Sequence, residues 1–149
     1  MSTNTEQKIK RSTDFWKRTN TTPLLGYSLG SYFISKRFEA VKELLAEPRK
    51  IEASMLKVEA FTSDYLRMAE AWGSVDHDIV FTAAPFPGIP WMEAMLGCDV
   101  YSTGSSFVAR ATGENLQDVD LRHLIRVEWF NKYIEFTEML QSYRLFVGN

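Results

Sequence analysis

The chain has very little cysteine, little histidine and almost no excess of charge. Cys98 is the single cysteine among 149 residues, so no disulfide can form within the chain, and a reducing compartment is expected. With only two histidines beside it, the sequence cannot supply a standard four-ligand zinc site of its own. The formal net charge is −2, and this near balance argues against a nucleic-acid-binding protein, which normally has a strongly basic face.

Long apolar runs and phosphate-binding signatures are missing as well. No stretch reaches the roughly 18 apolar residues that a membrane span needs. The weakly apolar stretch 23–34 is interrupted by glycine, serine and tyrosine, unlike a secretory signal. Neither a G-x-G-x-x-G motif nor a G-x-x-x-x-G-K-[ST] motif occurs, so nothing indicates nucleotide binding. These absences favour a cytoplasmic protein without a membrane or nucleic-acid partner.

What is present describes a globular domain whose charge is divided unevenly. Hydrophobic residues make up 45% of the chain and charged residues 24%, as in ordinary folded domains. Residues 1–60 hold 11 basic and 7 acidic side chains, a net charge of +4, which leaves −6 for residues 61–149. The basic half is interpreted first as solvated helix faces and second as a surface that attracts anions.

Helix patterns dominate the first half of the chain. The sequence predicts a short helix over 3–18, a strand or tight loop over 22–31, and a helix over 38–45 that ends before a proline. A long helix over 49–72 is predicted from apolar residues spaced by four and three, namely Ile51, Met55, Val58, Thr62, Tyr65, Ala69 and Trp72. Such a stripe indicates core packing rather than a cofactor site.

Short strands and helices alternate in the second half. The run 78–83 predicts a buried strand, and a helix is expected over 91–96, after a proline-rich turn. Residues 100–109 are typical of a hairpin or of two short extended pieces, 121–142 contain a helix, and 145–147 begin a further strand. This order of helices and strands indicates an α/β fold.

Two places carry polar or nucleophilic side chains that are open to two interpretations. His77 lies between Asp76 and Asp78, and this series is either an acid–base centre or weak metal site, or helix capping and loop solvation. Neighbouring side chains on a strand point to opposite faces, so His77 and Asp78 cannot share one pocket, and Asp78 is the better functional candidate. Cys98 is interpreted as a small buried hydrophobe first and as a nucleophile second.

The most unusual stretch is 84–94, Ala-Pro-Phe-Pro-Gly-Ile-Pro-Trp-Met-Glu-Ala. Its three prolines fix the backbone, and its glycine allows close approach of another group. A rigid aromatic loop at the carboxyl end of a strand is where α/β enzymes place ligand pockets. The alternative is a tight connection from strand to helix with a buried Trp91.

The same stretch resembles a known family. Residues 87–94, Pro-Gly-Ile-Pro-Trp-Met-Glu-Ala, followed by Leu96-Gly97-Cys98 and Val100, resemble the uroporphyrinogen decarboxylase family, in particular its bacterial branch related to corrinoid and coenzyme M methyltransferases. The likeness extends over nearly all of 22–143. It implies a (β/α)8 TIM barrel with a ligand cleft at the carboxyl ends of the strands. Members of the family either decarboxylate a tetrapyrrole without a cofactor or transfer methyl groups with zinc and a corrinoid.

The resemblance also implies roles for individual residues. It makes Asp78 the catalytic aspartate and assigns substrate contacts to the loop that follows, at Phe86, Gly88, Ile89, Trp91 and Glu93. Residues 26–32 contain no arginine, although true decarboxylases carry there an arginine-rich segment that binds substrate carboxylates. The zinc ligands of the methyltransferases lie in the C-terminal half of the family, so this chain is expected to hold neither a metal nor a cofactor.

The expected organisation is a polar N-terminal segment with a short helix, 1–21, followed by the N-terminal part of a uroporphyrinogen decarboxylase-like barrel, 22–149. A closed barrel needs about 200 residues or more, so the expected fold is α/β, a partial (β/α)8 barrel that is not closed. The chain is then an N-terminal fragment of a tetrapyrrole decarboxylase or corrinoid-dependent methyltransferase-type enzyme, inactive alone, with a tetrapyrrole or corrinoid as its ligand. The alternative is a non-catalytic module that pairs with another subunit. A complementing subunit or a homo-oligomer is expected because a partial barrel leaves sheet edges exposed.

Overall fold

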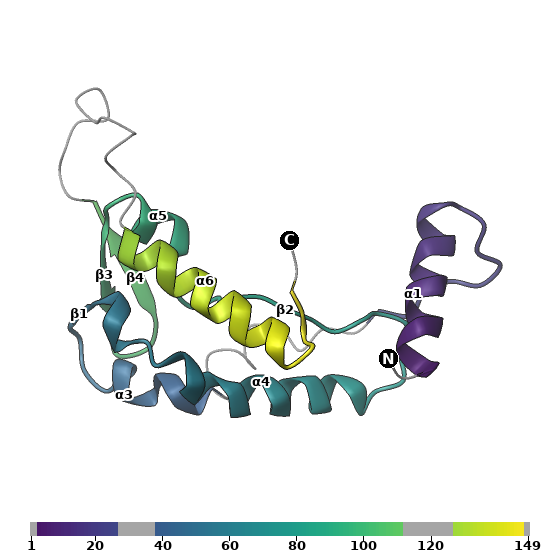
Figure 1. Ribbon diagram of the computed structural model, residues 1–149, viewed down its shortest axis with the longest axis horizontal. Helices are drawn as coiled ribbons and strands as arrows, with labels where there is room; N and C mark the ends of the chain where they lie inside the picture. The colour runs from purple at the N-terminus through teal and green to yellow at the C-terminus, as the bar shows by residue number, and fades with distance from the viewer. Residues whose placement is uncertain (1–2, 27–37, 112–126, 148–149) are drawn as a thin grey trace, which may run out of the picture.

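The computed structural model describes residues 3–26, 38–111 and 127–147 (Figure 1). Its helices, with η marking the 3-10 type, are α1 (Thr3–Trp16), η1 (Glu39–Val41), α3 (Lys42–Leu45), η2 (Ala53–Met55), α4 (Val58–Gly73), α5 (Trp91–Met95) and α6 (Val127–Ser142). Its strands are β1 (Lys50–Ile51), β2 (Thr82–Ala83), β3 (Asp99–Ser102), β4 (Phe107–Arg110) and β5 (Phe146–Val147). Figure 1 shows α1 at one end of the molecule and the β3–β4 hairpin at the other, with α6 running above α4 between them.

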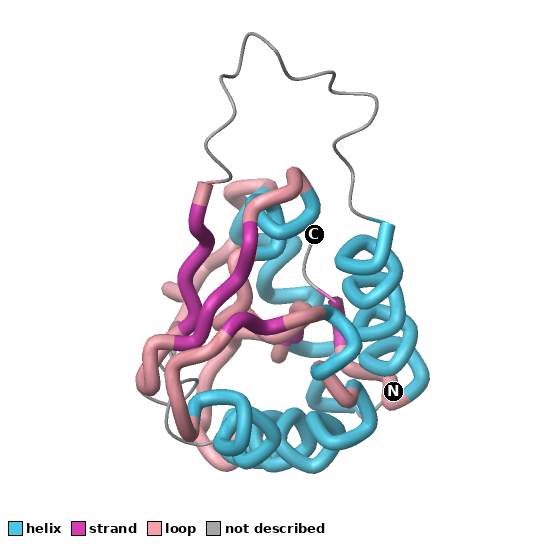
Figure 2. The backbone as a smooth tube through the Cα atoms, turned by 90° about the vertical axis from the view of Figure 1, so that its left-hand side faces the viewer, coloured by secondary structure: helices cyan, strands magenta, loops and turns pink. Residues whose placement is uncertain are grey.

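The strands form two separate small sheets. The first is antiparallel in the order β1-β3-β4, with Ile51 opposite Val100, and Figure 2 shows its hairpin strands along one flank. The second is a parallel pair, β2 and β5, with Thr82 opposite Phe146. Parallel strands need a long crossover, and here the connection contains α5, the hairpin and α6. Neither sheet closes on itself in the described residues.

An aromatic core joins the helices to the sheet. Phe61 of α4 meets Phe136 of α6 edge to face, with ring centroids 4.9 Å apart. Phe38, just before η1, contacts Phe61 and Tyr65 at centroid distances of 6.1 and 5.2 Å. Edge-to-face geometry places the positive ring edge against the negative face of its neighbour, which adds to the stability gained by burial. Phe86 and Trp129 also belong to this core, and its aliphatic and small side chains include Val41, Leu44, Ile51, Leu56, Val58, Ala94, Val100 and Leu140.

Several predictions from the sequence are confirmed. A helix occupies 3–16, and 38–45 is helical as η1 followed by α3. The hairpin forms from β3 and β4, and α5 follows the proline-rich turn. The C-terminal helix forms as α6, and a strand begins shortly after Leu145 as β5. Each of these elements has a sequence signal within a few residues of its own position in the chain.

Two boundaries predicted from the sequence were wrong. The helix predicted to begin at 49 begins at Val58, because residues 50–51 pair with β3 as strand β1 and bury Ile51. The strand predicted over 78–83 is restricted to Thr82–Ala83, because the backbone N–H groups of Asp78 and Ile79 are bonded to Leu25 O and His77 Nδ1 instead. The strand or loop predicted over 22–31 is described only to residue 26, where it forms no strand, and the rest lies outside the described residues.

Candidate functional site

The proline-rich loop begins directly after the carboxyl end of β2. Its first residue, Ala84, accepts a 2.6 Å hydrogen bond from the buried hydroxyl of Tyr65 on α4. Phe86 is only 2% exposed, and its ring lies among those of Phe38 and Phe61, at centroid distances of 5.0 and 5.4 Å. The loop is therefore held to the core from both sides, as a rigid loop must be if it is to position a ligand.

Gly88 allows the loop to fold back over the ring of Phe86. A Cβ atom at this position would lie 2.4 Å from Cε1 and 2.6 Å from Cζ of Phe86, closer than any side chain tolerates. The amide of Ile89 closes the turn by donating a 3.3 Å hydrogen bond to Phe86 O. The glycine is thus required by close approach of a side chain, as the sequence pattern indicated.

Trp91 anchors the start of α5. Its Nε1 donates a 2.9 Å hydrogen bond to Phe86 O, which ties the helix back to the loop. The indole ring meets three rings of α6 edge to face, those of Trp129, Tyr133 and Phe136, at centroid distances of 5.9, 5.4 and 5.7 Å. This arrangement is the tight connection of the alternative interpretation, with a tryptophan that is partly rather than fully buried. Glu93, in contrast, is exposed in the first turn of α5.

The predicted substrate-contacting residues line only a small pocket. Phe86 and Gly88 border an apolar cavity of about 90 Å³, together with Val41, Leu45, Phe107 and the hairpin serines Ser105 and Ser106. Ligand pockets for drug-sized molecules range from about 300 to 1,000 Å³. Ile89 is buried, and Trp91 packs on α6, so neither lines this cavity. The described residues therefore do not enclose a space for a tetrapyrrole at this loop.

A larger groove is bordered by Trp129, whose ring also contacts that of Trp91. Its volume is about 510 Å³, and it is lined by Lys50, Ile51, Glu52, Ala53, Ser54, Asp99, Val100, Glu128 and Trp129. Lys50 and Asp99 form a 2.9 Å ion pair across the β1–β3 ladder. Sequence reasoning missed this groove, because its three segments are far apart in the chain and only strand pairing and helix packing bring them together.

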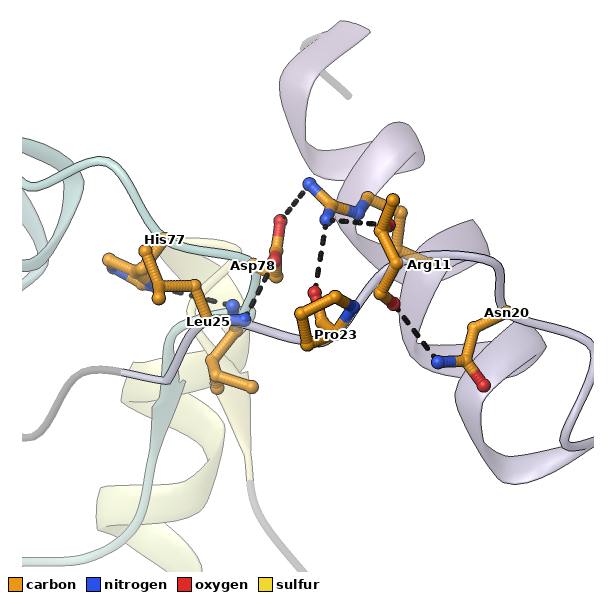
Figure 3. A network of polar contacts seen from close by, with 8 residues as sticks. Arg11, Asn20, Pro23, Leu25, His77 and Asp78 are labelled. Carbon is orange, nitrogen blue, oxygen red and sulfur yellow. Dashed lines mark hydrogen bonds and ion pairs between the residues drawn. The ribbon is translucent and has the colours of Figure 1, made fainter.

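Asp78 lies in a different place, where residues 22–25 pass beside the chain that leads into β2 (Figure 3). It is only 6% exposed. Its Oδ2 accepts a 2.8 Å hydrogen bond from the amide of Leu25, and its own amide donates one of 2.8 Å to Leu25 O. Oδ1 forms an ion pair with Arg11 of α1. The amide and both carboxylate oxygens of Asp78 are therefore bonded to residues far away in the sequence, as expected of a residue that holds two segments together.

His77 is buried next to Asp78 and is hydrogen-bonded through both ring nitrogens. Nε2 lies 3.0 Å from Trp72 O in the last turn of α4, and Nδ1 lies 3.2 Å from the amide of Ile79. Because the Ile79 amide can only donate, Nδ1 is the acceptor and Nε2 carries the proton. His77 thus bonds a carbonyl at the end of α4, which confirms the helix-capping part of the interpretation, whereas the burial of His77 and Asp78 contradicts the loop-solvation part. Asp76 is exposed.

The structure does not bring the predicted site residues together. Asp78 is bound to α1, whereas the loop leads into α5, and Figure 1 shows these two helices at opposite ends of the molecule. Asp78 also precedes β2, while the loop follows it. A barrel enzyme uses groups at the carboxyl ends of its strands. The loop therefore lies at the end of β2 that such a site requires, and Asp78 lies at the other end.

A buried carboxylate that the sequence did not single out is Asp64 of α4. It is 2% exposed, and its two oxygens accept hydrogen bonds of 3.1 and 3.0 Å from the amides of Glu39 and Ala40, at the start of η1. Arg67 pairs with the same carboxylate. Burial, and next the charge of Asp64, raises the pKa of the neighbouring Tyr65 hydroxyl well above its usual range. Asp64, on α4, thus caps the amino-terminal end of η1.

The described residues offer no metal-binding cluster. No group of three or more His, Cys, Asp or Glu side chains lies close enough in 3–26, 38–111 and 127–147 to hold a metal ion. Cys98 is partly buried just after α5. No helix in this part of the chain is both long and apolar enough to cross a membrane.

Comparison with known proteins adds nothing to this geometry. The chain matches no family model, no curated protein and no solved structure.

Proposed function

We propose that the chain forms the N-terminal part of a uroporphyrinogen decarboxylase-like barrel, an enzyme of the tetrapyrrole decarboxylase or corrinoid-dependent methyltransferase type. The observation that carries this proposal is the parallel pairing of β2 with β5. A (β/α)8 barrel is built from parallel neighbours joined by helical crossovers, and α6 belongs to the crossover here. The family-like loop 84–90 follows the carboxyl end of β2, the end at which barrel enzymes bind their ligands.

In this proposal the chain is inactive by itself. Within the described residues β2 and β5 pair only with each other, so each leaves one edge open to a further strand. The 90 Å³ cavity beside Phe86 is also too small for a tetrapyrrole or a corrinoid. Further strands, from another segment or subunit, would extend the sheet and complete the cleft around the loop. Before that, the chain alone is expected to bind one face of the macrocycle at the loop without enclosing it. The single cysteine favours the cytoplasm as the place where this occurs.

The loop, and not Asp78, contributes the ligand contacts in this proposal. Glu93 is exposed at the start of α5, and Phe86 and Gly88 border the small cavity. Asp78 serves as an anchor at the opposite end of β2, although the resemblance makes it the catalytic carboxylate. A tetrapyrrole or corrinoid macrocycle presents a broad apolar face, which suits an aromatic loop that is rigid before the ligand binds.

A spectral titration tests the ligand class. Hydroxocobalamin and coproporphyrin are each titrated with the chain, and their visible absorption is recorded. A saturable shift with one of the two is expected, and it should be weakened at least tenfold in Gly88→Ala, in which the loop cannot close over Phe86. Gly73→Ala is the matched control, because a Cβ there meets nothing within 4 Å. No shift with either compound would refute the tetrapyrrole and corrinoid proposal.

The second candidate function is a non-catalytic module that pairs with another subunit. The observation that favours it is an exposed apolar stripe on α6, formed by Val127, Phe130 and Ile134 at spacings of three and four. Exposed apolar surface of this kind often marks an interface. If the chain is such a module, light scattering will detect association at micromolar concentration. Phe130→Ser will weaken it, whereas the neighbouring Asn131→Ser will not.

A further inference from the structure

Helix α1 is attached to the rest of the molecule differently from every other helix described. None of its described side chains belongs to the buried core, and its large apolar residues Ile9, Phe15 and Trp16 are all exposed, Trp16 to 78%. Figure 1 shows α1 standing apart at one end. Burial of apolar surface therefore contributes little to holding this helix in place.

Among the contacts between described residues, the Arg11 side chain of α1 reaches the segment before β2. Arg11 forms an ion pair with Oδ1 of Asp78, and its guanidinium also lies 3.4 Å from Thr22 Oγ1 and 3.5 Å from Pro23 O (Figure 3). A second ion pair of α1 between described residues, Lys10 with Asp14 at 2.8 Å, stays within the helix. The Arg11 side chain is about half exposed, so salt and water reach one side of its pair with Asp78.

Asp78 is held independently of α1. Its amide and its Oδ2 are both bonded to the backbone of Leu25, so the carboxylate keeps its place when Arg11 leaves. Oδ1 has its described ion pair with Arg11, so we expect this oxygen to become the accessible part of the carboxylate when Arg11 leaves. Release of α1 would break the Arg11–Asp78 pair and the longer Arg11 contacts with Thr22 and Pro23, and it would remove no described residue of the buried core.

We propose that α1 is a salt-sensitive latch that closes on Asp78 through Arg11. In the closed state the guanidinium neutralises and covers Oδ1. In the open state the helix separates, and the carboxylate becomes accessible at its fixed position beside Leu25. This opening requires no unfolding of the core and belongs to the low-energy local motions of the protein. The inference does not depend on the proposed function, since it concerns the opposite end of β2.

Chemical labelling of carboxylates measures the latch directly. The full chain is treated with a water-soluble carbodiimide and glycine ethyl ester, and the rate at which Asp78 is modified is read by peptide mass spectrometry. Between 50 mM and 1 M NaCl, wild-type labelling of Asp78 is expected to rise about tenfold, because salt screens a pair that is exposed on one side. In Arg11→Gln the rate is expected to be equally high at both salt concentrations.

Two controls make each outcome decisive. Lys10→Gln removes the same charge one residue away without touching Asp78, so its Asp78 labelling should follow the wild type. Asp64, 2% exposed in the core, should stay unmodified throughout, and its labelling would reveal a variant that has unfolded. If Arg11→Gln has unfolded, the dependence of wild-type Asp78 labelling on salt tests the latch by itself. The latch is refuted if wild-type Asp78 labels at a rate independent of salt, or if folded Arg11→Gln labels no faster than wild type.

Discussion

Replacing Gly88 by alanine tests the packing on which the loop depends. The new Cβ atom would lie 2.4 Å from one ring carbon of Phe86 and 2.6 Å from another. Phe38, Phe61 and Phe107 lie around the ring at centroid distances of 5.0, 5.4 and 6.2 Å, so it can move only toward the small cavity of about 90 Å³ that it borders. Gly88 is not among the described residues with positive φ, so the cost is steric and not a matter of backbone strain.

The size of this effect follows from overpacking. Forcing an extra carbon against a buried side chain costs about 1–3 kcal/mol. For a chain of this length, a loss of 1 kcal/mol lowers Tm by about 2–4 °C, so a fall of about 3–10 °C is expected by calorimetry or circular dichroism. Gly73→Ala adds the same atom at the end of α4 without any contact within 4 Å, and it should leave Tm equal or higher, since alanine favours a helix.

A second substitution identifies the contact responsible. Phe86→Leu removes part of the ring that Gly88→Ala would strike, so the double variant should be destabilised by less than the sum of the two single changes. A coupling of at least about 1 kcal/mol is expected from urea unfolding. The reasoning fails if Gly88→Ala melts with the wild type, or if the two substitutions are additive.

Three further substitutions probe the polar supports of the core. Tyr65→Phe loses the hydrogen bond to Ala84 O and should cost about 1 kcal/mol in urea unfolding at pH 8. The difference in unfolding free energy between wild type and Tyr65→Phe should shrink from about pH 10 upward. The raised pKa of Tyr65 keeps its hydroxyl protonated in the folded chain, whereas the same hydroxyl ionises in the unfolded chain. Rising pH therefore stabilises the unfolded state of the wild type but not that of Tyr65→Phe. Asp64→Asn keeps one acceptor oxygen, although the amides of Glu39 and Ala40 each bond a separate oxygen of Asp64. This change should lower the free energy of unfolding in urea by about 2–3 kcal/mol. The control, Asp76→Asn at an exposed position, should change it by less than about 0.5 kcal/mol. His77→Ala loses both ring hydrogen bonds and should cost about 2 kcal/mol with faster hydrogen exchange at the end of α4, and unchanged exchange there would contradict the capping role.

The sequence predicted elements whose signals are local. Pro90 before α5, the turn residues between β3 and β4, and the aromatic spacing of α6 each lie within a few residues of the structure they predict. The wrong boundary at 49–57 has a non-local cause, since Ile51 belongs to an apolar helical stripe but is buried by pairing with Val100, 49 positions away. Periodicity cannot distinguish the two, because both bury the same side chain.

The candidate site was also predictable only where its signals are local. The close approach at Gly88 and the packed Trp91 could be anticipated from residue types within one loop. The environment of Asp78 could not, because its partners Arg11 and Leu25 come from a segment more than 50 residues earlier. The same holds for the groove between Lys50 and Glu128, which exists only after strands and helices have packed.

Hydrogen exchange with and without a bound macrocycle tests most directly whether the carboxyl end of β2 is the ligand end. The chain is incubated with whichever of hydroxocobalamin or coproporphyrin shifts its spectrum, and exchange is followed in peptides covering 84–94 and 76–82. Slower exchange confined to 84–94 is the expected result. Slower exchange around Asp78 instead, or no change in either peptide, would contradict the proposed site.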